Sequence, residues 1–179
     1  KHKRYDEGLR YLQSAAALRP EEAAEVHDKI GIALARIEDH KGAIEAFQKA
    51  VRLRPEFSAA WNNLALALVE DRNYDDAIEA HQRAIKLDPT SDLYYSYFGV
   101  TLGQAGETKE AIQALEKSVE LGPRNHSNLL NLGSVWSGLG DYEKALAAYD
   151  RGLDLTDASA GLYNNIGVVW ANKKEFAKA

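Results

Sequence analysis

Histidine is the residue of this sequence best suited to acid–base or metal chemistry near neutral pH. The chain contains five, and no two of them have the spacing of a metal-binding helix motif: His2, His27, His40, His81 and His126. His27 and His81 occupy repeat positions that hold large packing residues elsewhere, so we interpret them as packed side chains. Cysteine is absent, which excludes thiolate ligands and cysteine nucleophiles. We therefore predict no catalytic residue, no metal site and no cofactor.

Two further patterns resemble functional sites only superficially. Gly138-Leu139-Gly140 is rich in glycine, but no strand is predicted before it, so a phosphate-binding loop is not expected. Glu110, Glu116 and Lys117 have the spacing of an ordinary solvated helix face. Neither pattern predicts a binding site.

Composition narrows the classes of partner. Of the 179 residues 45% are hydrophobic, which is enough to bury a core. The net charge of -5 repels a phosphate backbone, so nucleic acid is not expected as a partner. The apolar stretches are far shorter than the roughly 18 residues of a membrane-spanning helix, so membrane insertion is not expected either. These features favour a soluble protein, with a slight preference for the cytoplasm.

The sequence is built on an internal repeat. Four alanines recur at intervals of 34 residues: Ala43, Ala77, Ala111 and Ala145. Small residues recur at the same interval: Gly31, Ala65, Gly99, Gly133 and Gly167. Within a repeat, large residues such as Trp61, Leu64 and Leu68 form one stripe of an α-helix. The pattern predicts two antiparallel helices per repeat, which approach closely because small residues lie between them.

The pattern resembles the tetratricopeptide repeat (TPR) family, in which large, small and aromatic residues, Ala and Pro follow at fixed spacing. One repeat carries it in Trp61, Leu64, Ala65, Leu68, Ala77, His81 and Pro89. The resemblance implies an all-α fold, a right-handed superhelical solenoid of antiparallel helix pairs. It divides the chain into the second helix of a truncated repeat, four full repeats and the first helix of a further truncated repeat: residues 1–23, 24–57, 58–91, 92–125, 126–159 and 160–179.

The pattern departs from the family at the turns and stops within a repeat at both ends. Asp157 replaces the expected proline, and one extra residue lies between Pro20 and Pro55. A single helix pair cannot bury both of its faces. We therefore expect further sequence, a partner or self-association to cover helices such as the one that contains Trp170.

The resemblance also implies a place for a ligand, because first helices in this family line a concave surface that commonly binds an extended peptide or a partner helix. The candidate peptide-binding residues face away from the buried stripe: Asn62, Asn63, Leu66, Tyr97, Val100, Asn131, Ser134, Asn164 and Asn165. Asn63, Asn131 and Asn165 share one repeat position, so a row of carboxamides could bind a peptide backbone. The alternative is that these amides only join neighbouring helices. Tyr97 interrupts the row, either as a binding hot spot or as part of a bulky core stretch.

These observations predict a protein–protein interaction module without enzymatic activity, which binds an extended or helical segment of a partner in its concave groove. Two alternatives remain: a structural or self-assembling scaffold, and an array that recruits substrates to a catalytic domain outside these residues. Some members of the family instead bind chaperone tails by clamping their terminal carboxylate. This mode is not expected here, because Lys29 and Arg36 have no basic counterparts in the next two repeats.

Overall fold

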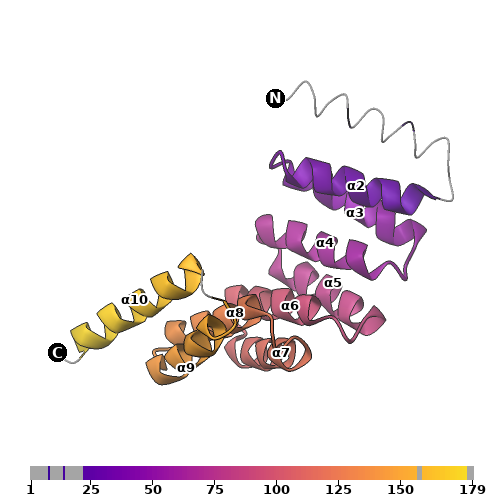
Figure 1. Cartoon of the computed structure of the whole chain (residues 1–179). Helices are drawn as coiled ribbons and strands as arrows, with labels where there is room; N and C mark the ends of the chain where they lie inside the picture. The colour runs from indigo at the N-terminus through magenta and orange to yellow at the C-terminus, as the bar shows by residue number, and fades with distance from the viewer. Residues whose placement is uncertain (1–7, 9–13, 15–21, 157–158, 177–179) are drawn as a thin grey trace. The chain divides into compact units, whose positions relative to one another are not determined.

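The computed structural model describes residues 8, 14, 22–156 and 159–176. Within these ranges the chain forms helices and no strand (Figure 1): α2 (Ala23–Ala35), α3 (His40–Leu53), α4 (Ser58–Glu70), α5 (Tyr74–Leu87), α6 (Asp92–Ala105), α7 (Thr108–Leu121), α8 (His126–Gly138), α9 (Tyr142–Leu153) and α10 (Ala160–Phe176). The prediction of an all-α fold is confirmed. The predicted second helix over residues 1–23 lies almost entirely outside the described residues.

The chain divides into two compact units, one over residues 1–89 and the other over residues 90–179. In the first unit α2 packs on α3 and α4 packs on α5, while α3 also contacts α4. In the second unit α6 packs on α7 and α8 packs on α9, and α10 contacts both helices of the second pair. Each unit is therefore a short stack of helix pairs.

Glycines of the first helices allow this close packing. In three pairs a first-helix glycine faces a large buried side chain of the second helix: Gly31 and Phe47, Gly99 and Leu115, Gly133 and Tyr149. A Cβ atom added to Gly133 would lie 2.4 Å from Cε1 of Tyr149. The pair α4 and α5 has Ala65 and His81 at the same two repeat positions, both with 0% of their surface exposed. The predicted close approach of the helices is confirmed.

Burial changes the acid–base behaviour of His81. The imidazole is fully buried, and its burial lowers its pKa from 6.5 to about 4. A buried site disfavours the charged form of a base, so His81 is neutral at physiological pH. The interpretation of His81 as a packed side chain is confirmed.

A turn of fixed geometry joins the two helices of each pair. One residue of each turn has a left-handed backbone: Glu38 (φ 64°), Arg72 (φ 60°), Gly106 (φ 90°) and Gly140 (φ 77°). The next residue is the N-cap of the second helix. Asp39, for example, accepts a hydrogen bond from the backbone N–H of Gly42 at 3.0 Å, and Asp141 accepts one from Lys144 at 3.2 Å. Such caps satisfy backbone groups that a helix end leaves unpaired.

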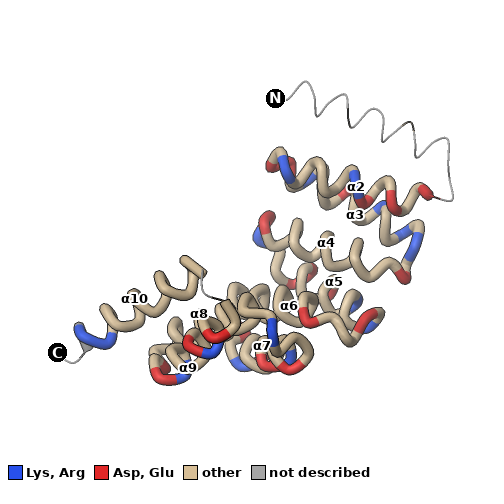
Figure 2. The backbone as a smooth tube through the Cα atoms, in the orientation of Figure 1, with Lys and Arg blue, Asp and Glu red and all other residues tan. Residues whose placement is uncertain are grey.

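Charge is unevenly distributed between the two kinds of helix (Figure 2). Among the first helices, α4 carries Glu70 and α6 carries Asp92, while α8 carries no Asp, Glu, Lys or Arg. The second helices carry several charged residues each. The surfaces of α4, α6 and α8 therefore carry few charges, whereas the first helix α2 carries Glu25, Asp28 and Lys29.

Candidate functional site

Each unit contains a groove between two consecutive first helices, close to their C-terminal ends. The groove of the first unit, called the first groove, has a volume of about 520 Å³. Helices α2, α3 and α4 and the turn after α2 line it: Ile32, Ala35, Arg36, Glu38, His40, Phe47, Asn63, Leu66, Ala67 and Glu70. Its floor is apolar, whereas the exposed side chains of Arg36, Glu38 and Glu70 stand at its edge.

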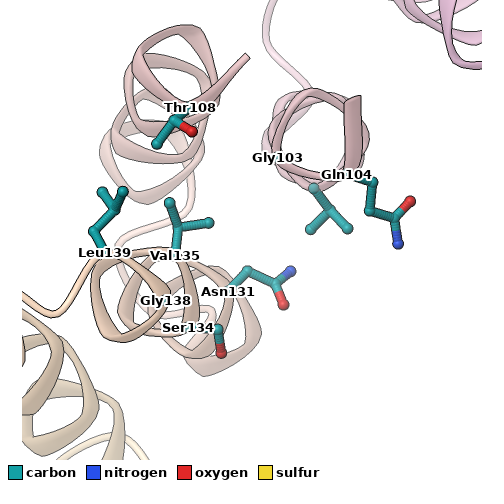
Figure 3. A pocket seen from close by; sticks show the side chains of 9 residues that line it. Gly103, Gln104, Thr108, Asn131, Ser134, Val135, Gly138 and Leu139 are labelled. Atoms are coloured by element: carbon teal, nitrogen blue, oxygen red, sulfur yellow. The ribbon is translucent and has the colours of Figure 1, made fainter. Parts of the chain in front are cut away.

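The groove of the second unit, called the second groove, has a volume of about 430 Å³. Helices α6 and α8 and the start of α7 line it: Val100, Gly103, Gln104, Thr108, Asn131, Ser134, Val135, Gly138 and Leu139. Figure 3 shows Asn131 and Val135 extending from α8 toward α6, while Gln104 extends from α6 on the same side. The lining contains amides, hydroxyls and apolar groups but no charged residue.

The two grooves are the same structure built twice. Their lining residues occupy equivalent positions two repeats apart, as Ile32 and Val100 or Asn63 and Asn131 show. Each groove therefore has a branched aliphatic residue on the earlier first helix and an asparagine on the later one. The repeat geometry itself creates the groove, and the side chains determine what it can bind.

The two groove asparagines also join neighbouring first helices. The Nδ2 group of Asn63 donates a hydrogen bond to Oδ1 of Asp28 at 2.8 Å. The Nδ2 group of Asn131 donates one to Oγ of Ser96 at 3.1 Å. The structure shows no hydrogen bond within the described ranges to the carbonyl oxygen of either amide. One N–H of each amide thus holds the helices together, and the oxygen is available to accept a further hydrogen bond.

The Asp28 carboxylate that accepts from Asn63 is itself buried. Burial raises the pKa of Asp28, although the hydrogen bond from Asn63 lowers it in part. A carboxylate taken out of water is costly unless a donor compensates it. Asn63 therefore has a structural task in addition to its position in the first groove.

A smaller hollow of about 140 Å³ lies between α8 and α10. Asn165 and Ser134 line it together with Tyr149, and Nδ2 of Asn165 donates to Oγ of Ser134 at 3.2 Å. The same Oγ donates to the backbone oxygen of Leu130 at 2.8 Å. These bonds tie α10 to α8, so Asn165 repeats the helix-joining role of the other two asparagines with a different partner.

The nine candidate residues of the sequence analysis lie at different places in the structure. Asn63 and Leu66 line the first groove, and Val100, Asn131 and Ser134 line the second. Tyr97 is half-buried and Asn164 is exposed, and neither lines a groove described above.

Asn62 is corrected by the structure, because only 4% of its surface is exposed. The equivalent residues Asp28 and Ser96 are buried as well, and each accepts a hydrogen bond from the next first helix of its own unit. Sequence spacing placed Asn62 on the outer face of the helix together with Asn63. Its burial leaves Asn62 unavailable to a ligand.

Sequence reasoning also missed residues that form the end of each groove. His40 and Thr108, which begin the second helices, line the first and second grooves, and so do the turn residues Glu38 and Leu139. The prediction considered first helices alone. The signal was present in the repeat itself, because the turn brings the start of each second helix beside the end of the first.

Other classes of site are not evident in the described part of the chain. No three His, Asp or Glu side chains among the described residues are grouped as metal ligands would be. None of the helices that the structure describes is long and apolar enough to span a membrane.

Comparisons with known proteins agree with this geometry. The family model for the tetratricopeptide repeat matches residues 1–55, 29–92, 98–160 and 137–179. A search of curated proteins gave no match.

Several solved structures share the fold. A crystal structure of MamA is 25% identical, with a TM-score of 0.72 over 86% of this chain and 84% of that one. MamA from Desulfovibrio magneticus RS-1 is 24% identical, with a TM-score of 0.75 over 84% of this chain and 85% of that one. YrrB, described as a TPR protein with an unusual peptide-binding site, is 19% identical, with a TM-score of 0.69 over 91% of this chain and 84% of that one.

The repeat pattern, the stacked helix pairs and the match over nearly the whole sequence lead to one assignment. TPR proteins are generally non-catalytic and serve in protein interactions. The chain belongs to the tetratricopeptide repeat family and is a protein-interaction module.

Proposed function

We propose that this chain binds an extended or helical peptide segment of a partner protein in the first and second grooves. The observation that carries the proposal is the duplication of one groove at equivalent positions, each with an apolar floor and an asparagine oxygen. An apolar concavity with a few placed polar groups is the usual form of a ligand site. The fold shared with YrrB, which is described as having a peptide-binding site, supports the proposal.

The groove residues match the chemistry of a peptide. Leu66 and Ile32 are half-buried, so they offer apolar surface that a side chain of the ligand can cover. The carbonyl oxygens of Asn63 and Asn131 can each accept a hydrogen bond from a peptide N–H, because their Nδ2 groups bond to the neighbouring helix. The proposed site therefore consists of Asn63, Leu66, Val100, Asn131 and Ser134 with the residues that line the two grooves beside them.

The test must weaken binding without disturbing the helix stack. Alanine at Asn63 would also remove the hydrogen-bond donor of the buried Asp28, so a loss of binding could not be separated from a loss of stability. Leu66→Ser is cleaner, because the equivalent position of the second groove already holds Ser134. Leu53→Ser is a matched control, since Leu53 is an exposed leucine outside both grooves.

The experiment is a pull-down from the source cells, followed by fluorescence anisotropy with labelled peptides tiled across each retained protein. We expect one tiled peptide to bind, and Leu66→Ser to weaken its binding by about tenfold, from the loss of roughly 1.5 kcal/mol of apolar contact. Leu53→Ser should leave the affinity unchanged. Equal binding by all three proteins, with circular dichroism showing the same fold, would place the contact outside the first groove and contradict the proposal for it.

A second candidate function, self-assembly as a scaffold, is favoured by the exposed face of α10. Tyr163 and Trp170 of this helix are 58% and 48% exposed, and among the described residues nothing outside the helix backbone lies within 4 Å of a Cβ built at Gly167. At Gly31, Gly99 and Gly133 the equivalent space is filled by a second-helix side chain. We propose that a helix of another copy covers this face.

Light scattering over a concentration series tests this second candidate. We expect the chain to associate as its concentration rises and Tyr163→Glu to keep it monomeric, because a charge on the contact face must lose its water on association. A monomer at all concentrations would remove self-assembly as a function of these residues and would leave the groove proposal intact.

A further inference from the structure

The two grooves share their shape but differ in charge. Arg36, Glu38 and Glu70 line the first groove, whereas the second groove has Gln104 where the first has Arg36 and Gly138 where the first has Glu70. Its lining contains no ionised residue. One chain thus offers two grooves of equivalent backbone with different electrostatic character.

The negative charges of the first groove lie where a helix least favours them. Glu70 is the last residue of α4, and the C-terminal end of a helix already carries partial negative charge from its unpaired carbonyl groups. The last turn of α4 has no basic residue to offset this charge. Helix α2 also ends at the first groove, with Ala35 as its last residue. Two helix C-terminal ends and two carboxylates therefore face the same space.

The positive charge of Arg36 does not neutralise these groups directly. Within the described ranges the structure shows no ion pair for Arg36, Glu38 or Glu70. All three side chains are exposed at the rim, and the apolar floor lies below them. The negative charge of Glu38, Glu70 and the two helix ends exceeds the positive charge of one guanidinium. The first groove therefore favours a cation from outside the chain.

We infer that the first groove selects a peptide segment in which a lysine or arginine stands next to a large apolar residue, while the second groove accepts an uncharged stretch. This inference rests on the proposed peptide-binding function and adds the chemistry of the partner. The apolar residue covers Leu66 and Ile32, and the basic residue lies against Glu70 and Glu38. The ammonium or guanidinium group donates hydrogen bonds to these carboxylates at the rim.

The probe is a library of random peptides displayed on phage, selected in parallel on the natural chain and on a Glu38→Gln, Glu70→Gln variant. Glutamine keeps the size of both side chains and removes only their charge. We expect peptides selected on the natural chain to be enriched in basic residues beside large apolar ones, and this enrichment to disappear on the variant. Gly138→Glu provides the converse test, because it places a carboxylate in the second groove where a Cβ meets no other atom within 4 Å.

A selected peptide and its analogue with norleucine in place of lysine then measure the charge alone. We expect the lysine to strengthen binding to the natural chain by up to about fivefold for each carboxylate at low salt, and to make no difference on the double glutamine variant. Arg36→Gln should tighten binding of the lysine peptide. Leu66→Ser should weaken both peptides equally, which assigns them to the first groove.

The outcomes separate the two proposals. Peptides that lose affinity on Leu66→Ser but carry no basic residue, or bind equally after both glutamine changes, would overturn the charge selection and keep the binding function. Selection of acidic peptides that depend on Arg36 would reverse the inferred sign of the ligand. A library that yields no peptide dependent on either groove would overturn both the selection and the function.

Discussion

Acidification should destabilise the first unit through His81, the one histidine that is buried within the described ranges. Its pKa is about 4 in the folded chain and 6.5 when exposed, so between these values the unfolded state binds a proton that the folded state does not. The free energy of unfolding therefore falls as the pH decreases through this window and levels off below it. The full effect is about 3 kcal/mol, and about 2 kcal/mol is already lost near pH 5.

The repeat itself supplies a control for this prediction. Replacing Ala65 by Gly and His81 by Phe reproduces the pair that Gly31 and Phe47 form in the preceding repeat. Phenylalanine alone would meet the Cβ of Ala65, since the phenyl ring of Phe47 occupies the space beside a glycine. The double variant removes the buried base and leaves all other titrating groups in place. The difference between the two proteins isolates the contribution of His81.

Urea unfolding followed by tryptophan fluorescence measures this difference. Phenylalanine at Trp136 and Trp170 leaves Trp61, in α4, as the reporter of the first unit. Between about pH 8 and about pH 5, we expect the free energy of unfolding of the natural chain to fall by about 2 kcal/mol more than that of the double variant. Equal losses in both proteins, or an NMR titration that gives His81 a pKa close to 6.5, would refute the reasoning from burial.

Four further substitutions test the packing, each by thermal or urea unfolding. Gly133→Ala should destabilise the second unit by about 1–3 kcal/mol, because the new Cβ lies 2.4 Å from Tyr149, and an unchanged stability would contradict that contact. Gly167→Ala should instead stabilise α10 by about 0.5–1 kcal/mol, since a Cβ there meets nothing. Asn63→Ala should cost about 1–3 kcal/mol and raise the pKa of Asp28 in an NMR titration, because the buried carboxylate loses its donor. Asp141→Ala should cost about 1 kcal/mol through the lost N-cap of α9, whereas Asp141→Asn should largely retain it.

Periodicity was enough to predict the fold, because the same spacing of small and large residues recurs in every full repeat. The interval that separates Gly31, Gly99 and Gly133 predicts both the helix pairs and the close contacts seen at these glycines. The same rule explains the one variation, where Ala65 and His81 replace a glycine and a large residue together. A paired change of this kind can be recognised in a single sequence, because the other repeats show which residues usually occupy the two positions.

The functional surface was less predictable, because it depends on neighbours that one repeat does not contain. Asn62 and Asn63 are adjacent in sequence, yet Asn62 is buried and Asn63 lies at a groove. The sequence left open whether the side chains of Asn63 and Asn131 bond to a ligand or to a neighbouring helix. Their Nδ2 groups donate to Asp28 and Ser96 of the neighbouring helices, which the sequence alone could not show. Side-chain partners across repeats require three-dimensional coordinates.

The left-handed turn residues give the two units different freedom to change during evolution. Gly106 and Gly140 adopt their positive φ without strain, but Glu38 and Arg72 do so with a side chain that the conformation disfavours by about 1–2 kcal/mol. A mutation to glycine at position 38 would relieve that strain, and it would also delete a carboxylate from the first groove. Selection for stability alone would therefore favour glycine at position 38 and remove a charge from the first groove. The turns of the second unit already contain Gly106 and Gly140, so its groove would not change in this way. Glutamate at position 38 in related chains would mark those in which the first groove is still under selection for binding.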